Sequence, residues 1–232
     1  MEAACRRAGR RPEEVRLVAV TKTVPPERIR EAYEAGLRHF GENRVQEAQA
    51  KQAALADLPA TWHLIGHLQT NKAKAARDIF HWVHSVDSLR IAEKLHQAAQ
   101  RHPDWPGEQA PEQPGTSGLH RLPVLIEVNL GGEASKSGIE EPAALELASH
   151  VGRLDTRDLC GLMVVPPYFD DPEKSRPYFS RLRELAKVLN SANLSGVRMD
   201  ELSMGMSHDF EVAVEEGATL IRVGTAIFGR RT

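Results

Sequence analysis

The chain has few cysteines, few aromatic residues and no long apolar run, and these shortages exclude several protein classes. Cys5 and Cys160 are the only cysteines among 232 residues, and they lie far apart and in no metal-binding spacing. A disulfide framework or a zinc finger is therefore excluded, and a reducing, cytoplasmic compartment is favoured. No stretch approaches the roughly 18 apolar residues of a membrane span, and the N-terminus lacks an apolar signal core.

An excess of charge of either sign is also missing. The 30 basic residues and 32 acidic residues nearly cancel. This composition carries no electrostatic footprint for nucleic acid or for an anionic membrane surface. We therefore predict a cytoplasmic protein whose partners are neither nucleic acids nor membranes.

Short apolar runs alternate with longer amphipathic segments along the whole chain. Eight strands are predicted at residues 15–20, 37–40, 61–65, 80–86, 122–130, 159–165, 201–204 and 219–223. Seven helices are predicted at residues 26–36, 44–52, 71–77, 89–100, 141–151, 172–189 and 209–216. Such alternation is typical of parallel βαβ units, and eight of them predict a closed (β/α)8 TIM barrel. A doubly wound open sheet is the alternative, and it requires a topological switch point that a sequence does not reveal.

Residues 102–121 fit no element, because prolines and glycines recur throughout the segment. We predict a single domain over residues 1–232 that carries a flexible insertion at 102–121. A tolerated surface loop without function is the ordinary interpretation of such an insertion.

Lys22 stands at the end of the first apolar run, residues 15–20, which is predicted to be a strand buried on both faces. Pro25 and Pro26 then end the strand and begin a helix. An ammonium at the mouth of a buried strand is partly desolvated, which favours the neutral amine that attacks carbonyl groups. A lysine that extends into water from a strand end is the alternative.

The last two strands are each followed by a candidate phosphate-binding segment. Ser207 begins the helix after the seventh strand, and Gly224 with Thr225 follows the eighth. Adjacent helix starts that carry hydroxyls and glycines are typical phosphate sites, and this fold often places one after strands seven and eight. Ordinary turn and cap chemistry is the alternative for either segment alone.

A phosphate site on one side of the barrel mouth and a reactive lysine on the other suit a ligand that carries a phosphate and an aldehyde. Pyridoxal 5′-phosphate (PLP) is such a ligand. Arg222 then becomes informative, because a guanidinium beside the pyridine nitrogen would keep that nitrogen unprotonated. A structural salt bridge is the alternative role for Arg222.

Seven segments resemble motifs of the YggS/PROSC family of PLP homeostasis proteins, and they occur in family order. They are AVTKT (19–23), FGENRVQE (40–47), WHLIGHLQTNK (62–72), SKSG (135–138), GLM (161–163), MGMS (204–207) and RVGTAIFG (222–229). The chain departs from the family pattern in two ways. It carries the insertion at 102–121, and its first helix is short, because only residues 3–9 can form helical turns before the first strand. We expect either that the helix covers less of the barrel floor than in the family or that the first residue of this sequence lies downstream of the true start.

The resemblance implies a barrel like the N-terminal domain of alanine racemase, with PLP held as a Schiff base on the lysine after the first strand. Carried over residue by residue, it implies seven cofactor-binding positions. They are Lys22 for the Schiff base, Ser207, Gly224 and Thr225 for the phosphate, Arg222 for the pyridine nitrogen, and Asn43 and Met206 for the pocket wall.

A second acid–base group is what separates a racemase from a carrier of PLP. In the alanine racemases it is a tyrosine from another domain, whereas this chain ends at Thr232, directly after the eighth strand, with no room for one. Tyr168 is the only tyrosine near a predicted strand end. We therefore expect no efficient catalysis, and no catalytic residue is assigned.

The expected function is PLP and amino-acid homeostasis, with transfer of PLP to apo forms of PLP-dependent enzymes by a monomer or weak dimer. The first alternative is a low-efficiency racemase or lyase with Tyr168 as the second base. The second is a regulatory protein whose partner senses cofactor occupancy.

Two histidine pairs raise the question of a metal site. His63 and His67 stand four apart, and His81 and His84 stand three apart. Residues 62–65 are predicted to form a strand, in which positions 63 and 67 are separated by more than about 10 Å. We therefore predict no metal site.

Overall fold

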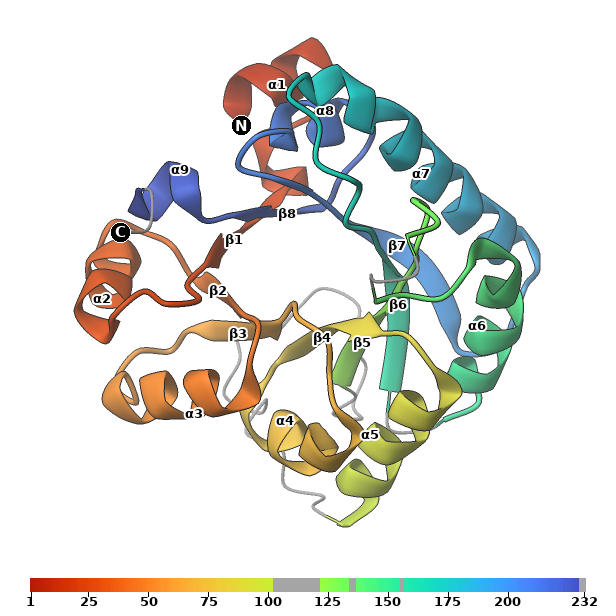
Figure 1. The fold of residues 1–232 in the computed structure, drawn as a ribbon, viewed down its shortest axis with the longest axis horizontal. Helices are drawn as coiled ribbons and strands as arrows, with labels where there is room; N and C mark the ends of the chain where they lie inside the picture. Colours follow the sequence, from red (N-terminus) through yellow and green to blue (C-terminus); the bar gives the residue numbers. More distant parts are fainter. Residues whose placement is uncertain (102–121, 134–136, 155–156, 230–232) are drawn as a thin grey trace.

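Eight parallel strands close into a barrel in which each strand pairs with the next in chain order and β8 pairs with β1 (Figure 1). The computed structural model describes residues 1–101, 122–133, 137–154 and 157–229. The strands are β1 (Arg16–Val20), β2 (His39–Glu42), β3 (Thr61–Leu64), β4 (Trp82–Val86), β5 (Leu122–Glu127), β6 (Arg157–Met163), β7 (Val197–Met206) and β8 (Leu220–Val223). The closed (β/α)8 barrel is confirmed, and the open sheet is excluded.

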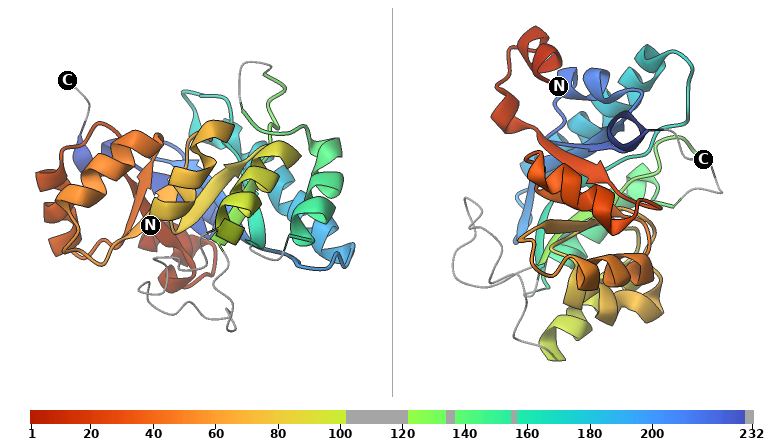
Figure 2. Two further views of the ribbon diagram at one scale, coloured as in Figure 1. Left: turned by 90° about the horizontal axis from the view of Figure 1, so that it is seen from below. Right: turned by 90° about the vertical axis from the view of Figure 1, so that its left-hand side faces the viewer.

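The helices form a layer around the outside of the strands, as the turned views show (Figure 2). They are α1 (Glu2–Arg7), α2 (Pro26–Glu34), α3 (Val45–Ala54), α4 (Ala73–Ile79), α5 (Leu89–Arg101), α6 (Ala144–Gly152), α7 (Arg176–Ser191), α8 (Phe210–Glu215) and α9 (Thr225–Phe228). Short 3-10 turns are η1 (Pro12–Glu14), η2 (Thr70–Lys72), η4 (Glu141–Ala143) and η5 (Pro172–Ser175). Over the described ranges, no helix has the length and apolar character that a membrane crossing needs.

Both faces of the strands are buried, which is why the sequence shows continuous apolar runs rather than alternation. The outward faces join the helices in one large core that includes Phe40 and Ile126. The inward faces form a separate cluster in the barrel lumen, made of Val18, Trp82, Leu125, Cys160, Met163 and Leu220. The lumen is therefore filled with side chains, as is usual for this fold.

The predicted boundaries differ most from the structure at β7, and those of β2 and β6 are each shifted by two residues. We predicted residues 201–204 for the seventh strand, but β7 runs from Val197 to Met206. The first half of β7 contains the exposed charged residues Arg198 and Asp200, so it does not show the apolar run by which the other strands were predicted. The second strand was placed at 37–40 but includes Glu42, which is a charged residue buried inside the protein. The predicted insertion at 102–121 lies outside the described residues.

The first helix is tied to the end of the barrel by arginines. The predicted helical turns at residues 3–9 correspond to α1, which lies beside α8 (Figures 1 and 2). Arg7 Nε donates to Glu215 Oε1 over 2.7 Å. Arg10 Nη1 donates to the backbone oxygens of Val214 and Ala218 over 2.9 and 2.8 Å. The N-terminal segment is thereby fastened to the turn that leads into β8.

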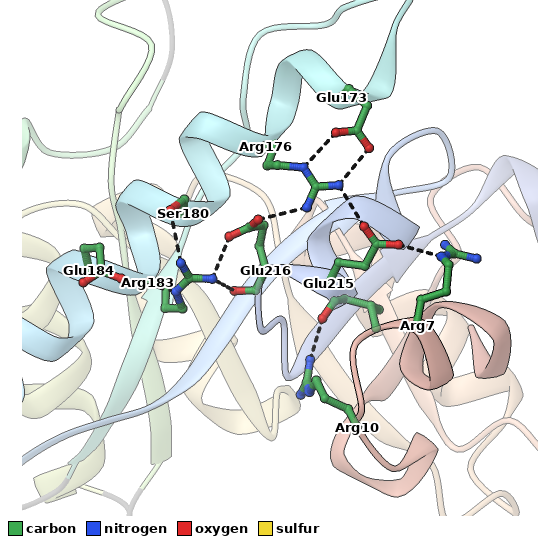
Figure 3. Close-up of polar contacts among 10 residues, drawn as sticks. Arg7, Arg10, Glu173, Arg176, Ser180, Arg183, Glu184, Glu215 and Glu216 are labelled. Atoms are coloured by element: carbon green, nitrogen blue, oxygen red, sulfur yellow. Dashed lines mark hydrogen bonds and ion pairs between the residues drawn. The ribbon is translucent and has the colours of Figure 1, made fainter.

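Arg176 extends this network to α7, as Figure 3 shows. Its guanidinium contacts Glu173, Glu215 and Glu216 over 2.7 to 2.9 Å. These contacts raise the pKa of Arg176 and lower the pKa of Glu215. Because Glu215 also contacts Arg7, the three helices α1, α7 and α8 share one set of charges.

Replacing Arg176 by glutamine should lower the melting temperature by about 2–4 °C, because a network loss of roughly 1 kcal/mol has that effect in a chain of this size. The difference from wild type should shrink in about 1 M salt, which screens partly exposed charges. Thermal unfolding followed by circular dichroism at low and high salt measures both. Arg90→Gln, at an exposed arginine with no ion pair to a described residue, is the control and should leave the melting temperature unchanged. An equal loss in both variants would contradict the network interpretation.

Candidate functional site

A cavity of about 200 Å³ lies between the carboxyl ends of β1 and β8. Val20 at the end of β1 and Lys22 shortly after it line one side, and Gly224 and Thr225, which follow β8, line the other. Lys22 is half-buried. Residues that are about 200 positions apart in the chain are adjacent here because β8 pairs with β1. The structure thus brings together three of the seven predicted site residues at one cavity.

A buried ion cluster supports the turn that carries Lys22. Lys51 Nζ donates to the backbone oxygen of Thr21 over 2.6 Å. It also contacts the carboxylates of Glu42 and Glu47, each over 2.7 Å. Burial raises the pKa of Glu42, while its contacts with Lys51 and Thr21 oppose that rise. One buried ammonium therefore holds the end of β1, β2 and α3 together directly beneath Lys22.

Thr23 completes this turn in an unusual backbone conformation. Its φ is +64°, in the left-handed region that β-branched residues rarely occupy. Its backbone N–H donates to Glu47 Oε1 over 2.5 Å. This contact offsets part of the conformational cost and keeps the chain turned sharply after Lys22.

Ser207 connects the end of β7 to the segment after β8. Its Oγ accepts hydrogen bonds from the N–H groups of Gly224 and Ala226 over 3.1 and 3.4 Å. A Cβ at position 224 would lie 3.3 Å from the backbone oxygen of Val20, so only glycine allows this approach without a shift. Ser207 thereby fixes the segment of Gly224 and Thr225, which lines the cavity, and its own O–H is left to donate, as suits a phosphate oxygen.

Arg222 is held inside the barrel below this edge. It is 4% exposed, and its Nη atoms donate to Ser203 Oγ over 2.6 Å and to the backbone oxygen of Val164 over 2.8 Å. Burial lowers the pKa of Arg222 to about 10, so the guanidinium stays charged at neutral pH. The predicted role beside a pyridine nitrogen requires such a fixed, permanently protonated group.

A chain of histidines continues from Arg222 through the lumen, and sequence reasoning missed it. Ser203 Oγ lies 2.9 Å from His84 Nδ1, and His84 Nε2 lies 2.9 Å from His63 Nδ1. His63 Nε2 lies 3.0 Å from His39 Nδ1. Burial lowers the pKa of all three histidines, that of His39 to about 4. Each neutral ring donates on one side and accepts on the other, so the chain orients Ser203 and through it Arg222.

This chain also accounts for the histidines that raised the question of a metal. Both ring nitrogens of His63 face other histidines, and His67 pairs instead with Asp87 over 2.8 Å. Among the described residues, no group of three or more His, Cys, Asp or Glu side chains is arranged to hold a metal ion. The signal for the chain was present in the alternation of His63 and His84 with apolar residues on predicted strands.

Asn43 and Met206 lie at strand ends but do not line the cavity of Lys22. Asn43 packs beside Gly66, where a Cβ would approach the Asn43 backbone oxygen to 2.5 Å. Met206 pairs in register with Arg222. Tyr168 is 74% exposed, with its ring centroid 5.4 Å from that of His208.

Comparison with known proteins identifies the family to which this chain belongs. The whole chain, residues 1–232, matches the family described as alanine racemase, N-terminal domain. It is 44% identical over 231 residues to a PLP homeostasis protein of Aquifex aeolicus, covering 100% of this chain and 93% of that one. It is 46% identical over 228 residues to a PLP homeostasis protein of Pseudomonas aeruginosa, covering 98% and 90%. The chain belongs to the family of PLP homeostasis proteins.

Solved structures agree with this family membership. PipY of Synechococcus elongatus PCC7942, in a structure with PLP bound, matches with a TM-score of 0.81 and 41% identity, covering 98% of each chain. An alanine racemase of Clostridium difficile 630 matches with a TM-score of 0.72 at 12% identity, covering 99% of this chain and 55% of that one. The second likeness shows a shared fold. The predicted resemblance to the PLP homeostasis family is confirmed.

Glu127 is a further residue at the barrel mouth that the sequence reasoning missed. It ends β5, is 8% exposed, and burial raises its pKa to about 7. Residue 127 lies inside the predicted strand 122–130, and only the apolar residues of that strand were considered. A charged residue near the end of the longest predicted strand was the available signal.

Replacing Lys51 by methionine should destabilise this member of the family by roughly 3–5 kcal/mol, because it leaves Glu42 buried without a charge partner. Urea unfolding at neutral pH measures the loss. The double variant Glu42→Met with Lys51→Met removes both charges and should recover more than half of it. A loss below about 1 kcal/mol for Lys51→Met alone would show that the cluster does not hold the Lys22 turn.

The buried histidines should make the protein sensitive to acid. Their pKa values are lower in the folded state, so their stabilising effect is present above pH 6.5 and is lost as the pH falls towards about 4. His39→Asn should reduce that loss by roughly 1–2 kcal/mol, measured by urea unfolding across this range. His150→Asn, on the outer helix α6, is the control and should follow the wild-type slope. Identical slopes for all three proteins would refute the assignment.

Proposed function

We propose that this protein binds PLP in the cavity between β1 and β8 and serves in PLP (vitamin B6) and amino-acid homeostasis without efficient catalysis. The observation that carries the proposal is the placement of Lys22 across one cavity from Gly224 and Thr225. Arg222 is fixed in the lumen on the same side. PLP homeostasis relatives and a PLP-bound PipY structure support the same ligand.

Bound PLP supplies an aldehyde that condenses with a lysine amine and a phosphate that anchors it. In this assignment Lys22 offers the amine, because the cluster around Lys51 holds its turn at the cavity edge. The O–H of Ser207 would donate to the phosphate, because its Oγ already accepts from the N–H groups of Gly224 and Ala226. Arg222 stays protonated and faces the pyridine nitrogen. Asn43 and Met206 remain proposed as outer parts of the pocket wall.

The position of Tyr168 supports a carrier rather than a racemase. A second base must face the reacting carbon from the side opposite the lysine. Tyr168 is 74% exposed and packs on His208, beside the proposed phosphate segment. Because most of its surface is exposed to solvent, Tyr168 is not buried in a fixed position as a second base would need to be.

The remaining assignments complete this proposal. Both cysteines are free and buried, which supports a reducing cytoplasmic location. We assign residues 1–232 to one PLP-binding domain with an insertion at 102–121. Apo forms of PLP-dependent enzymes are the proposed acceptors, and the working form is a monomer or weak dimer.

Replacing Lys22 by alanine should abolish the violet absorbance of the lysine-bound cofactor. Borohydride reduction followed by mass spectrometry should place PLP on Lys22 in the wild-type protein and on no residue of Lys22→Ala. Lys94→Ala, at an exposed lysine of α5, is the matched control and should keep the full absorbance. A Lys22→Ala protein that retains covalent cofactor would reject this lysine as the attachment site.

The carrier assignment has its own assay. Purified holo-protein is incubated with each common amino acid, and racemisation and transamination are followed. Turnover near about 1 s⁻¹, the low end for enzymes, would reject the carrier. Tyr168→Phe then tests the alternative, because loss of that turnover would identify the second base.

A further inference from the structure

The carboxyl group of Glu127 points into the barrel mouth. Leu125, two residues earlier on β5, packs in the lumen cluster with Val18 and Leu220. Residues two apart on a strand face the same side, so Glu127 faces inward one layer nearer the mouth. In the closed ring of eight strands, β5 lies opposite β1. Glu127 therefore enters the mouth from the side opposite Lys22.

One oxygen of this carboxyl group has no donor among the described residues. Glu127 is 8% exposed, and its Oε2 is buried without a hydrogen-bond partner among the described residues. The positive charge of Arg222 acts on Glu127, but the guanidinium donates to Ser203 and Val164. A buried carboxylate without a donor is costly, which is why burial raises the pKa of Glu127 to about 7. A ligand that donates hydrogen bonds would remove this cost.

A second carboxyl group stands beside the first. Val86 of β4 pairs with Ile126 of β5, so Asp87 and Glu127 follow at the same height on neighbouring strands. The Asp87 side chain is 12% exposed and contacts His67 over 2.8 Å. Its charge raises the pKa of Glu127 further, and His67 and Arg222 oppose this rise. Two carboxyl groups thus act on each other at this level of the barrel, and Arg222 and His67 offset part of their charge.

The space beside Asp87 suits an organic cation. A cavity of about 390 Å³ is lined by Asp87, His67 and polar groups, together with the apolar side chains of Leu68 and Ile91. Among the residues that the structure describes, no group of three or more His, Cys, Asp or Glu side chains is arranged here to hold a metal ion. An ammonium needs only two or three acceptors, and the carbon chain attached to it can contact the apolar wall.

We propose that Glu127 and Asp87 form a binding site for the ammonium group of a primary amine, across the barrel mouth from Lys22. The ammonium balances the charge of both carboxylates, while the rest of the amine occupies the cavity that Asp87 lines. Glu127 does not line that cavity, so its side chain turns toward Asp87 when it accepts from the ammonium. The biological role of this site rests on the proposed function, because a protein that carries PLP has to bind an amine to which the cofactor is transferred. Free amino acids and amines without a carboxylate share this chemistry.

Calorimetric titration of the full chain tests the site, both with and without PLP. The probes are propylamine, L-alanine and the neutral control propanol. Propylamine should bind wild type roughly tenfold to hundredfold more tightly than propanol does, as expected for a charge-assisted hydrogen bond in a buried site. Glu127→Gln should abolish that difference, Asp87→Asn should reduce it, and Glu146→Gln on the surface of α6 should leave it unchanged.

Comparison of the probes identifies the source of the amine. Tighter binding of L-alanine than of propylamine supports free amino acids, and the reverse supports amines without a carboxylate. The proposal fails if propylamine and propanol bind alike. It also fails if Glu127→Gln binds propylamine as wild type does.

The pH dependence separates Glu127 from its neighbours. Glu127 has to lose its proton to bind an ammonium, so wild-type affinity should rise from about pH 6 to about pH 8, while the amine stays charged. The charged and titratable groups that act on Glu127 are Asp87 from the segment after β4, Arg222 from β8 and His67 from the segment after β3. His67→Asn should keep the rise, and Glu127→Gln should lose it. The opposite pattern would overturn the assignment.

Cofactor absorbance on the same samples keeps this test distinct from the proposed function. Absent PLP absorbance with intact binding of propylamine would reject the cofactor assignment and retain the ammonium site. Full PLP absorbance with no preference for propylamine would reject the ammonium site and retain the cofactor assignment.

Discussion

The pairing of β8 with β1 is the constraint on which the rest of the structure depends. It places Val18 opposite Arg222 and Ala19 opposite Val223, and thereby sets the start and end of the described chain side by side. Gly224 makes this closure tight, since any side chain there would press on Val20. The cavity of Lys22 exists only because the barrel closes at this seam. The arginines of α1 and the Arg176 network fasten the outer helices next to the same region.

The lumen combines an apolar cluster with a polar column, which is the hydrogen-bonded chain from Arg222 and Ser203 through the three histidines. This division determines where charge lies in the lumen. His39, His63 and His84 are buried and neutral, so their hydrogen bonds orient Ser203 without adding charge beneath the mouth. Arg222 is then the fixed positive group at the top of the column. Such a design holds one guanidinium rigidly at moderate cost, because every member of the column has a partner. Glu127 differs, since its Oε2 has none among the described residues.

The fold was predictable from periodicity because parallel strands in this barrel are buried on both faces and are separated by amphipathic helices. The predicted strand boundaries were wrong where a charged residue is buried and where part of a strand is exposed and charged. Glu42 belongs to β2, where Lys51 and Thr21 both donate to its Oε1, and no local pattern in the sequence reveals these contacts. The first half of β7 was missed because its exposed residues are charged. Of the site, Lys22, Gly224 and Thr225 were predicted from strand ends and resemblance, and the structure places them at one cavity.

The sequence by itself determined the number and order of strands, the family motifs and the lysine after the first strand. These features are local in the chain, so composition and spacing carry them. Only the tertiary structure decided which side chains meet across the lumen. The contacts of Lys51 with Thr21, of His84 with Ser203 and of Glu127 with Asp87 join segments that are distant in sequence. Such contacts depend on barrel closure and register, because a shift of one residue would turn each of these side chains to the opposite face.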